Sequence, residues 1–114
     1  MVHSSIRMVM PHNKRVEAQT ILMSVAERTR VEAGCINCNL YQCIEDEHVM
    51  MMEELWHSNE DLERHLRSDE YLKVLLVVEM ALKKPEIRFD FISCSTGVET
   101  IKKAKGILHK HSKG

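Results

Sequence analysis

The sequence predicts an α+β fold of the ferredoxin-like kind. Its element order is β-α-β-β-α-β, with four antiparallel strands in one sheet and the helices on one face. Apolar residues recur at helical spacing over residues 14–33 and again over 59–84. Two β-prone runs joined by a short charged turn lie between these stretches, while one strand-like run precedes them and another follows. A chain of 114 residues has room for one such domain with one core.

The first strand and the first helix are predicted from a change of apolar spacing near Pro11. The strand residues that share a face are Ile6, Met8 and Met10. Pro11 closes the strand, and Asn13 is expected to cap a helix over residues 14–33. Gly34 is expected to end that helix in the left-handed conformation. The residues expected on its buried face are Ala18, Ile21, Leu22, Val25 and Ala26.

A hairpin is predicted over residues 35–56, where the runs CINCNLYQCI and HVMMMEELW flank the turn Glu45-Asp46-Glu47. Regular alternation places Cys35 and Cys38 on opposite faces of a strand, so we expect neither a disulfide between them nor a metal site there. Both faces of the hairpin are apolar, with Met50, Met52 and Trp56 on one and Tyr41, Val49, Met51 and Leu55 on the other. A sheet with one solvated face does not show this pattern. The sequence therefore predicts a homodimer formed through the sheet face that the helices leave open.

The second helical stretch is predicted in two pieces, each with a cap of its own. Ser58 and Asp61 form a carboxylate version of the capping box, and Ser68 caps the second piece. Apolar residues are almost continuous in that piece, so we expect it to be buried on most sides until Pro85 stops it. The strand that follows alternates, with Ile87, Phe89 and Phe91 on one face. We assign residues 1–97 to the domain and 98–114 to a basic tail, helical from Val98 to Leu108.

Composition and charge exclude several classes of function. The formal net charge of -1 gives no electrostatic footprint for nucleic acid. No apolar run approaches the ~20 residues of a membrane span, and the N-terminal stretch is too polar for a signal peptide. Four cysteines are too few to indicate a disulfide scaffold. We therefore expect a soluble cytoplasmic protein with no nucleic-acid or membrane partner.

Three segments carry a resemblance to a known family: GCINCNLYQ, MEELWHSNEDLERHLRSDEY and RFDFISCSTG. In them a Gly-Cys pair (34–35) opens the second strand, a Glu-x-Trp motif (54–56) ends the third, and a His-Leu-x-Ser motif (65–68) lies in the next helix. Over residues 5–97 the chain resembles the antibiotic biosynthesis monooxygenase family of dimeric α+β barrels. The resemblance implies that fold and a dimer. It also implies a range of activities, since the family includes quinol-oxidising enzymes, enzymes that tailor aromatic polyketides and haem-degrading proteins.

Departures from the family pattern imply that no cofactor is used. The haem-degrading members carry an Asn on the first strand, a Trp in the middle helix and a His further along it. Here the first strand has no Asn, His65 stands at the Trp position, and the ligand position falls near Leu75 in an apolar stretch. Haem degradation is therefore not expected. His57 and His65 also lack the i, i+4 spacing of a helical zinc pair, so we expect no metal site.

The resemblance thus implies a small monooxygenase that oxidises a quinol or phenolic substrate without a cofactor. His65 would remove the phenol proton, because the ordinary pKa of histidine, near 6.5, suits a general base. Trp56 would stack on the substrate and donate a hydrogen bond to the developing anion. Glu54 would either orient His65 or pair with a surface lysine. The residues expected to line the site are Cys38, Leu40, Met52 and Tyr71.

Structural interpretations of the same residues stay open. Trp56 can simply close the end of the sheet, and a lone inward-facing histidine is more often a core residue than a base. The protein would then be a non-catalytic dimeric module that binds or senses a small hydrophobic ligand. Cys38 supports this alternative, since it stands where the family usually has an aromatic residue.

Overall fold

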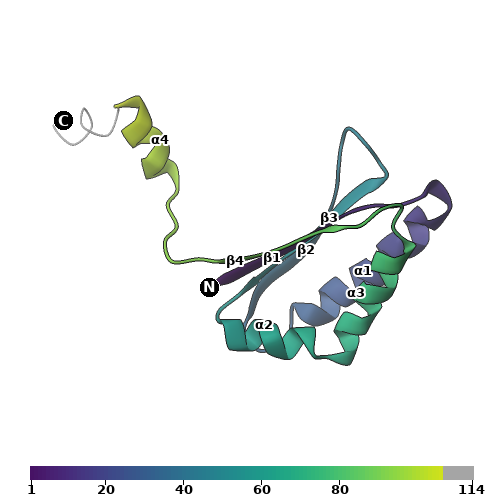
Figure 1. Cartoon of the computed structure of the whole chain (residues 1–114). Helices are drawn as coiled ribbons and strands as arrows, with labels where there is room; N and C mark the ends of the chain where they lie inside the picture. The colour runs from purple at the N-terminus through teal and green to yellow at the C-terminus, as the bar shows by residue number, and fades with distance from the viewer. Residues whose placement is uncertain (107–114) are drawn as a thin grey trace.

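The fold class agrees with the prediction. The computed structural model describes residues 1–106. Its elements are β1 (Val2–Val9), the 3₁₀ turn η1 (His12–Lys14), α1 (Arg15–Thr29), β2 (Cys35–Gln42), β3 (Val49–Trp56), α2 (Asn59–Leu66), α3 (Asp69–Met80), β4 (Glu86–Phe91) and α4 (Val98–Lys105). The strands form one antiparallel sheet in the order β2-β3-β1-β4. Figure 1 shows α1, α2 and α3 on one face of this sheet, which is the ferredoxin-like arrangement.

The core lies between the sheet and the helices, and the strand register decides which residues enter it. Ile6 of β1 pairs with Met52 of β3 on one side and with Ile87 of β4 on the other. Residues directly opposite each other in antiparallel strands point to the same face, so alternate residues of β1 and β3 meet the helices. The side chains buried there include Met8, Leu22, Val25, Met50, Met52, Val74 and Val77. Burying one side chain of this size contributes roughly 1.5–3 kcal/mol.

The ends of α1 differ from the prediction. Asn13 lies inside η1, and Lys14 occupies the N-cap position without a side-chain hydrogen bond. At the other end α1 stops at Thr29, and the turn that follows leads to Gly34, whose φ is +84°. Gly34 is left-handed as predicted, but it shapes the entry to β2 instead of ending the helix. A Cβ atom here would lie 2.1 Å from Cγ of Asp61, so both the backbone conformation and the available space require glycine.

A β-bulge at the start of β2 overturns the prediction for the cysteines. Residues 35 and 37 pair with the consecutive residues 56 and 55 of β3, which leaves Ile36 as an extra residue. Cys35 and Cys38 therefore lie on the same, helix-facing side of the sheet. The expectation that they point to opposite faces was wrong, because regular alternation assumes a strand without a bulge. Both residues are free thiols.

The helix α3 is less buried than predicted. Only one stripe of it is buried, formed by Tyr71, Val74 and Val77. The side chains of Leu72, Leu75 and Leu76 are 56%, 43% and 57% exposed. An almost continuous apolar run suggested burial on most sides, but α3 lies at the surface of the domain and packs through a single stripe. The helix also ends at Met80, before Pro85 is reached.

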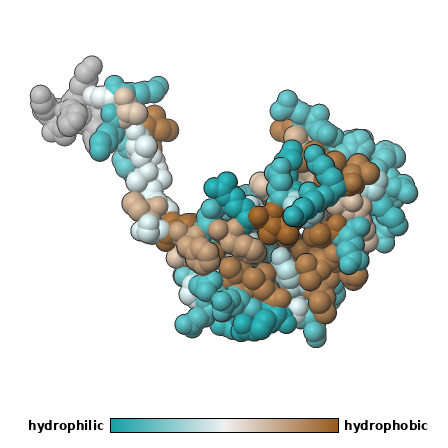
Figure 2. Space-filling view, in the orientation of Figure 1, coloured by the Kyte–Doolittle hydropathy of each residue, from teal (hydrophilic) through white to brown (hydrophobic). Residues whose placement is uncertain are grey.

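The face of the sheet opposite the helices is half apolar and half charged. Over β2 and β3 it carries Tyr41, Met51 and Leu55, so the prediction of apolar groups on both faces of the hairpin is confirmed. Over β1, β4 and part of β3 it carries ion pairs, which are His3–Glu53 (2.8 Å), Arg7–Glu86 (3.9 Å) and Arg88–Asp90 (3.1 Å). We call this surface the open face. Figure 2 shows hydrophobic and hydrophilic residues side by side on one side of the domain surface.

The segment after β4 leads away from the domain. Residues 92–97 run to α4, which stands apart from the sheet (Figure 1). The helix begins at Val98 as predicted and ends at Lys105, while Leu108 lies outside the described residues. Val98 and Ile101 are 60% and 57% exposed. Within residues 1–106, none of the helices has the length and apolar character needed to cross a membrane.

Candidate functional site

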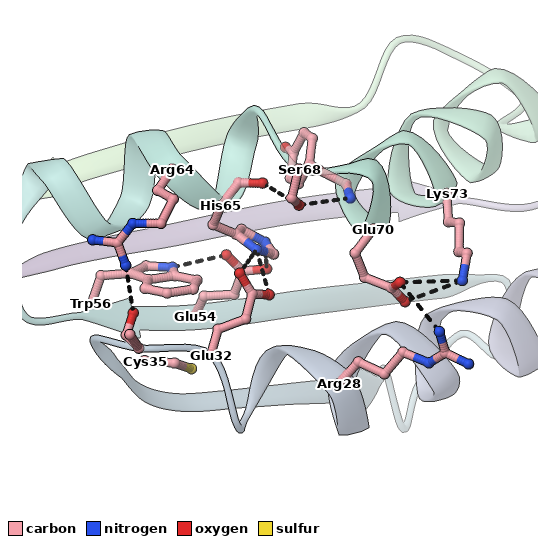
Figure 3. Close-up of polar contacts among 12 residues, drawn as sticks. Arg28, Glu32, Cys35, Glu54, Trp56, Arg64, His65, Ser68, Glu70 and Lys73 are labelled. Atoms are coloured by element: carbon pink, nitrogen blue, oxygen red, sulfur yellow. Dashed lines mark hydrogen bonds and ion pairs between the residues drawn. The ribbon is translucent and has the colours of Figure 1, made fainter.

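A buried histidine lies between two carboxylates near the end of β3 (Figure 3). Nδ1 of His65 is 2.9 Å from Oε2 of Glu32, and its Nε2 is 3.2 Å from Oε2 of Glu54. The indole Nε1–H of Trp56 donates a hydrogen bond of 3.0 Å to the other oxygen of Glu54. The His65 side chain is fully buried and that of Glu54 is 4% exposed, whereas that of Glu32 is 28% exposed. The four residues form a chain of contacts from the protein surface into the core.

Each of these side chains is positioned by a different element. Alternation along β3 directs both Glu54 and Trp56 toward the helices. Ser58 accepts a hydrogen bond from the backbone N–H of Asp61 and so starts α2, which places His65 in its last turn. Ser68 donates to the carbonyl of His65 and caps α3 through the backbone N–H of Tyr71. The caps predicted for both helices are thus confirmed, and together they fix the position of the imidazole.

The hydrogen bonds indicate the protonation state of His65. A neutral imidazole donates from one nitrogen and accepts at the other, but here both nitrogens face carboxylate oxygens. Burial, the largest single influence, lowers the pKa of His65. The hydrogen bond and charge of Glu54, together with those of Glu32, outweigh it, so the net pKa is raised above the ordinary value of 6.5. Below this raised pKa the group is an imidazolium ion that can donate to both carboxylates.

Two aromatic rings enclose this imidazolium. The Trp56 ring lies 4.7 Å from that of His65 between centroids, and the Tyr71 ring meets it edge-on at 5.4 Å. Burial, followed by the charge of Glu54, raises the pKa of Tyr71 to about 12, so its hydroxyl stays protonated. The Trp56 N–H proposed as a donor to substrate is engaged with Glu54 in this arrangement. Of the two roles left open for Glu54, the contact with His65 is the one observed.

The other residues predicted for the site do not all join this cluster. Cys38 and Met52 lie in the neighbouring core, at 0% and 2% exposure. Leu40 lies further along β2, where it lines a hollow of ≈ 360 Å³ between α1 and the edge of the sheet. The lining of that hollow includes neither His65 nor Trp56. The structure therefore separates the predicted residues into a buried acid–base cluster, the core beside it, and a surface hollow.

Sequence reasoning missed Glu32. It lies 33 positions before His65, in the turn between α1 and β2, which was predicted to be part of the helix. The sequence shows only that Glu32 lies two residues before Gly34, which was expected in the left-handed conformation. This position does not indicate which distant residue the Glu32 carboxylate contacts.

The two cysteines beside the cluster are poor nucleophiles. Burial, reinforced by the charge of Glu54, raises the pKa of Cys35 to about 11 and that of Cys38 to about 12. Since the thiolate is the reactive form of cysteine, neither residue is activated at neutral pH. Their contribution to the site is apolar surface.

The fold and the cluster define a class of protein, a small ferredoxin-like domain with a buried acid–base group on the helix side of its sheet. The chain belongs to the antibiotic biosynthesis monooxygenase family, whose sequence model matches residues 1–75. The match confirms the resemblance seen in the sequence. A search of the curated proteins found no match.

Solved structures share the fold. A conserved protein from Methanosarcina mazei Go1 is 28% identical, with a TM-score of 0.73 over 78% of this chain and 89% of that one. Rv0793 from Mycobacterium tuberculosis is 21% identical, with a TM-score of 0.76 over 84% and 98% of the two chains. A structure described as an antibiotic biosynthesis monooxygenase is 15% identical, with a TM-score of 0.75 over 82% and 100%.

Proposed function

We propose that the protein is a cofactor-independent monooxygenase that oxidises a small quinol or phenolic substrate. The observation that carries this proposal is the buried cluster of Glu32, His65, Glu54 and Trp56. A fully buried histidine between two carboxylates is costly to maintain, and ionisable groups placed in this way concentrate at functional sites. Family membership favours oxygen chemistry at that site.

In this proposal His65 is the base that removes the phenol proton. The substrate hydroxyl displaces Glu54 from Nε2 and transfers its proton there, while Glu32 holds Nδ1–H. The electron-rich phenolate that results supplies all four electrons that reduce molecular oxygen: one oxygen atom forms a new C–O bond at a ring carbon that loses its hydrogen, and the other leaves as water, so that phenol and O2 give quinone and water. Because only neutral imidazole accepts a proton, turnover rises with pH as His65 loses its resting proton. The buried position excludes water from the reacting anion.

The surrounding side chains would hold the aromatic ring. Trp56 offers a flat surface for stacking, and its N–H turns from the displaced Glu54 to the substrate anion. Tyr71, Met52 and Cys38 supply apolar walls. Trp56 and His65 are both 0% exposed, so the substrate enters by displacing side chains at the junction of α2 and the turn that carries Glu32.

A non-catalytic role in binding a hydrophobic ligand is the second candidate. The hollow beside Leu40 favours it, because Met23, Ala26, Tyr41 and Met50 give that hollow an apolar wall. Ligand pockets are typically apolar clefts of about this size or larger. In that case the buried cluster serves only to join β3, α2 and the turn before β2.

Oxygen consumption separates the two candidates. Purified protein treated with a chelator, without added flavin, is mixed with a panel of quinols and phenols in an oxygen electrode. The monooxygenase proposal expects protein-dependent oxygen uptake that His65→Gln lowers by about 100-fold or more under conditions where circular dichroism shows the variant to be folded. A ligand that raises the melting temperature of the protein, with no oxygen uptake from any compound in the panel, supports the binding module instead.

A further inference from the structure

A second cluster of ionisable side chains lies at the other end of the molecule. His12 of η1 meets Glu47 and His48 at the tip of the β2–β3 hairpin, and one potential ligand atom from each lies within 4.8 Å of the others. The two imidazole rings are 5.9 Å apart between centroids. Two imidazoles and one carboxylate form a donor set that suits divalent metals of the zinc type.

We propose that His12, Glu47 and His48 bind a divalent transition metal, with Zn²⁺ as the representative ion, and that Asp46 orients His48. Three protein ligands leave at least one coordination position open to solvent or to a small anion. The proposal is independent of the monooxygenase activity, since it concerns the opposite end of β3 from His65.

The backbone holds the ligands close to each other. The N–H of Met10 donates to the carbonyl of His48 at 2.8 Å, which joins the end of β1 to the hairpin tip. The N–H of Lys14 donates to the carbonyl of Pro11 at 2.9 Å and closes the turn that carries His12. Zinc ligands at ~2.0–2.1 Å from the ion lie about 3.4 Å apart in a tetrahedral site. His12 and Glu47 are exposed and His48 is half-buried, so small side-chain rotations bring the three ligand atoms onto one ion.

The environment of His48 resembles the outer shell of a metal site. Oδ1 of Asp46 is 3.1 Å from Nδ1 of His48 and 3.0 Å from its backbone N–H. A carboxylate that accepts a hydrogen bond from Nδ1 fixes the tautomer with a free Nε2, as is usual for metal-binding histidines. Arg15 lies 3.9 Å from Oε2 of Glu47, a long ion pair that leaves carboxylate oxygen available. Arg7 lies near enough to Asp46 for its charge to help lower the pKa of that carboxyl, after the larger effect of the hydrogen bonds from His48.

Metal titration of the full chain tests the proposal. Reduced, chelator-treated protein is titrated with Zn²⁺ by calorimetry and with Co²⁺ by absorption spectroscopy. We expect one ion per chain and a cobalt spectrum without the intense near-ultraviolet band of thiolate ligation. His12→Gln, His48→Gln and Glu47→Gln should each weaken zinc binding by about tenfold or more, and Asp46→Asn by about 10- to 100-fold. These side chains lie at the surface, so circular dichroism should show folded variants.

Other histidines provide matched controls. His57→Gln replaces an exposed histidine beyond the far end of β3, and the double variant His109→Gln/His111→Gln removes the histidines outside the described residues. Both should keep the zinc affinity of the wild-type protein. The proposal is overturned by the absence of stoichiometric zinc at micromolar concentrations, or by a thiolate band with Co²⁺. It is equally overturned if binding is lost with the tail histidines and unchanged in His12→Gln and His48→Gln.

Discussion

The two carboxylates that hold His65 differ in exposure, and this difference separates their roles. Glu54 is buried and would be left as an unpaired charge without His65, whereas the Glu32 side chain is 28% exposed. Changes at Glu32 therefore alter the electrostatics of His65 without burying a new charge. Glu32 is the better residue for testing whether His65 is a base.

Replacing Glu32 with Gln should shift the pH profile of turnover to lower pH. The charge and hydrogen bond of Glu32 help to raise the pKa of His65, so their loss increases the neutral fraction of the imidazole at a given pH. The amide oxygen of Gln still accepts the hydrogen bond from Nδ1–H, and we expect a change in stability of only about 0–1 kcal/mol. Oxygen uptake measured from about pH 5 to 9 gives the profile of each protein.

Glu63→Gln is the matched control, because Glu63 is exposed on α2 and bonds only to Asn59 among its described side-chain partners. Its pH profile should match that of the wild-type protein. Identical profiles for wild type and Glu32→Gln would show that His65 is not the base.

Folding stability should depend on pH through the same histidine. The folded-state pKa of His65 is raised, so its stabilising contribution is fully present below the unfolded value of about 6.5 and is lost as pH rises through the folded value. We expect His65→Gln to cost about 3–5 kcal/mol near pH 6, where it removes the cation that pairs with Glu54. The cost should be smaller near pH 9. Urea unfolding of both proteins across this range checks it, and a difference that does not change with pH would contradict a charged His65.

Three of the four residues in the buried cluster around His65 were predicted from the sequence. Trp56, Glu54 and His65 follow from local patterns, because strand alternation and a helix cap fix where their side chains point. Glu32 could not be predicted, since its contact depends on how the turn before Gly34 is shaped. Leu40 was assigned to the site because it was expected on the same strand face as Cys38. In the structure it lies farther along β2, away from the cluster around His65.

At the scale of elements, Gly34 joins the entry of β2 to the start of α2. Gly34→Ala places a Cβ within 2.1 Å of Cγ of Asp61 and forces alanine into a left-handed conformation. The conformation alone costs roughly 1–2 kcal/mol, and displacement of Asp61 weakens the capping of α2 by Ser58, worth about a further 1 kcal/mol. We expect a loss of about 2–3 kcal/mol in the free energy of unfolding, measured with denaturant.

Gly106→Ala separates the two effects. Gly106 also has a positive φ, +74°, but among residues 1–106 no atom lies within 4 Å of the added Cβ. It should cost only the conformational part, at the end of α4. A loss for Gly34→Ala no larger than the roughly 1–2 kcal/mol of the backbone conformation alone would mean that the contact with Asp61 contributes nothing.

Elements were easier to predict than their irregularities. The caps Ser58 and Ser68 are local signals, and both helices begin where they indicate. The bulge at Ile36 could not be predicted, because a single extra residue leaves the apolar pattern of a short strand nearly unchanged. It nevertheless moves Cys35 to the face of Cys38. The exposed leucines of α3 were missed because an apolar run does not show how much of a helix its neighbours cover.

At the scale of the whole molecule, one chain leaves much apolar surface uncovered. The open face carries Tyr41, Met51 and Leu55, with a hollow of ≈ 160 Å³ lined in part by Met51 and Val49. On the helix side, the edge strand β4 leaves Phe89 and Phe91 37% and 66% exposed. Contiguous exposed apolar patches usually mark an interaction surface. The family resemblance implies a dimer, and the open face remains our proposed interface.

A charge placed on the open face should therefore dissociate the protein. Met51→Lys puts two ammonium groups into a symmetric interface, where burial without a partner is costly, and we expect the dimer to weaken by about tenfold or more. Leu75→Lys is the matched control, since Leu75 is an exposed apolar residue on α3, on the opposite side of the sheet. Analytical ultracentrifugation of the three proteins over a range of concentrations measures the association. A monomeric wild type would rule out the dimer, and dissociation by Leu75→Lys with Met51→Lys unaffected would place the interface on the helices instead.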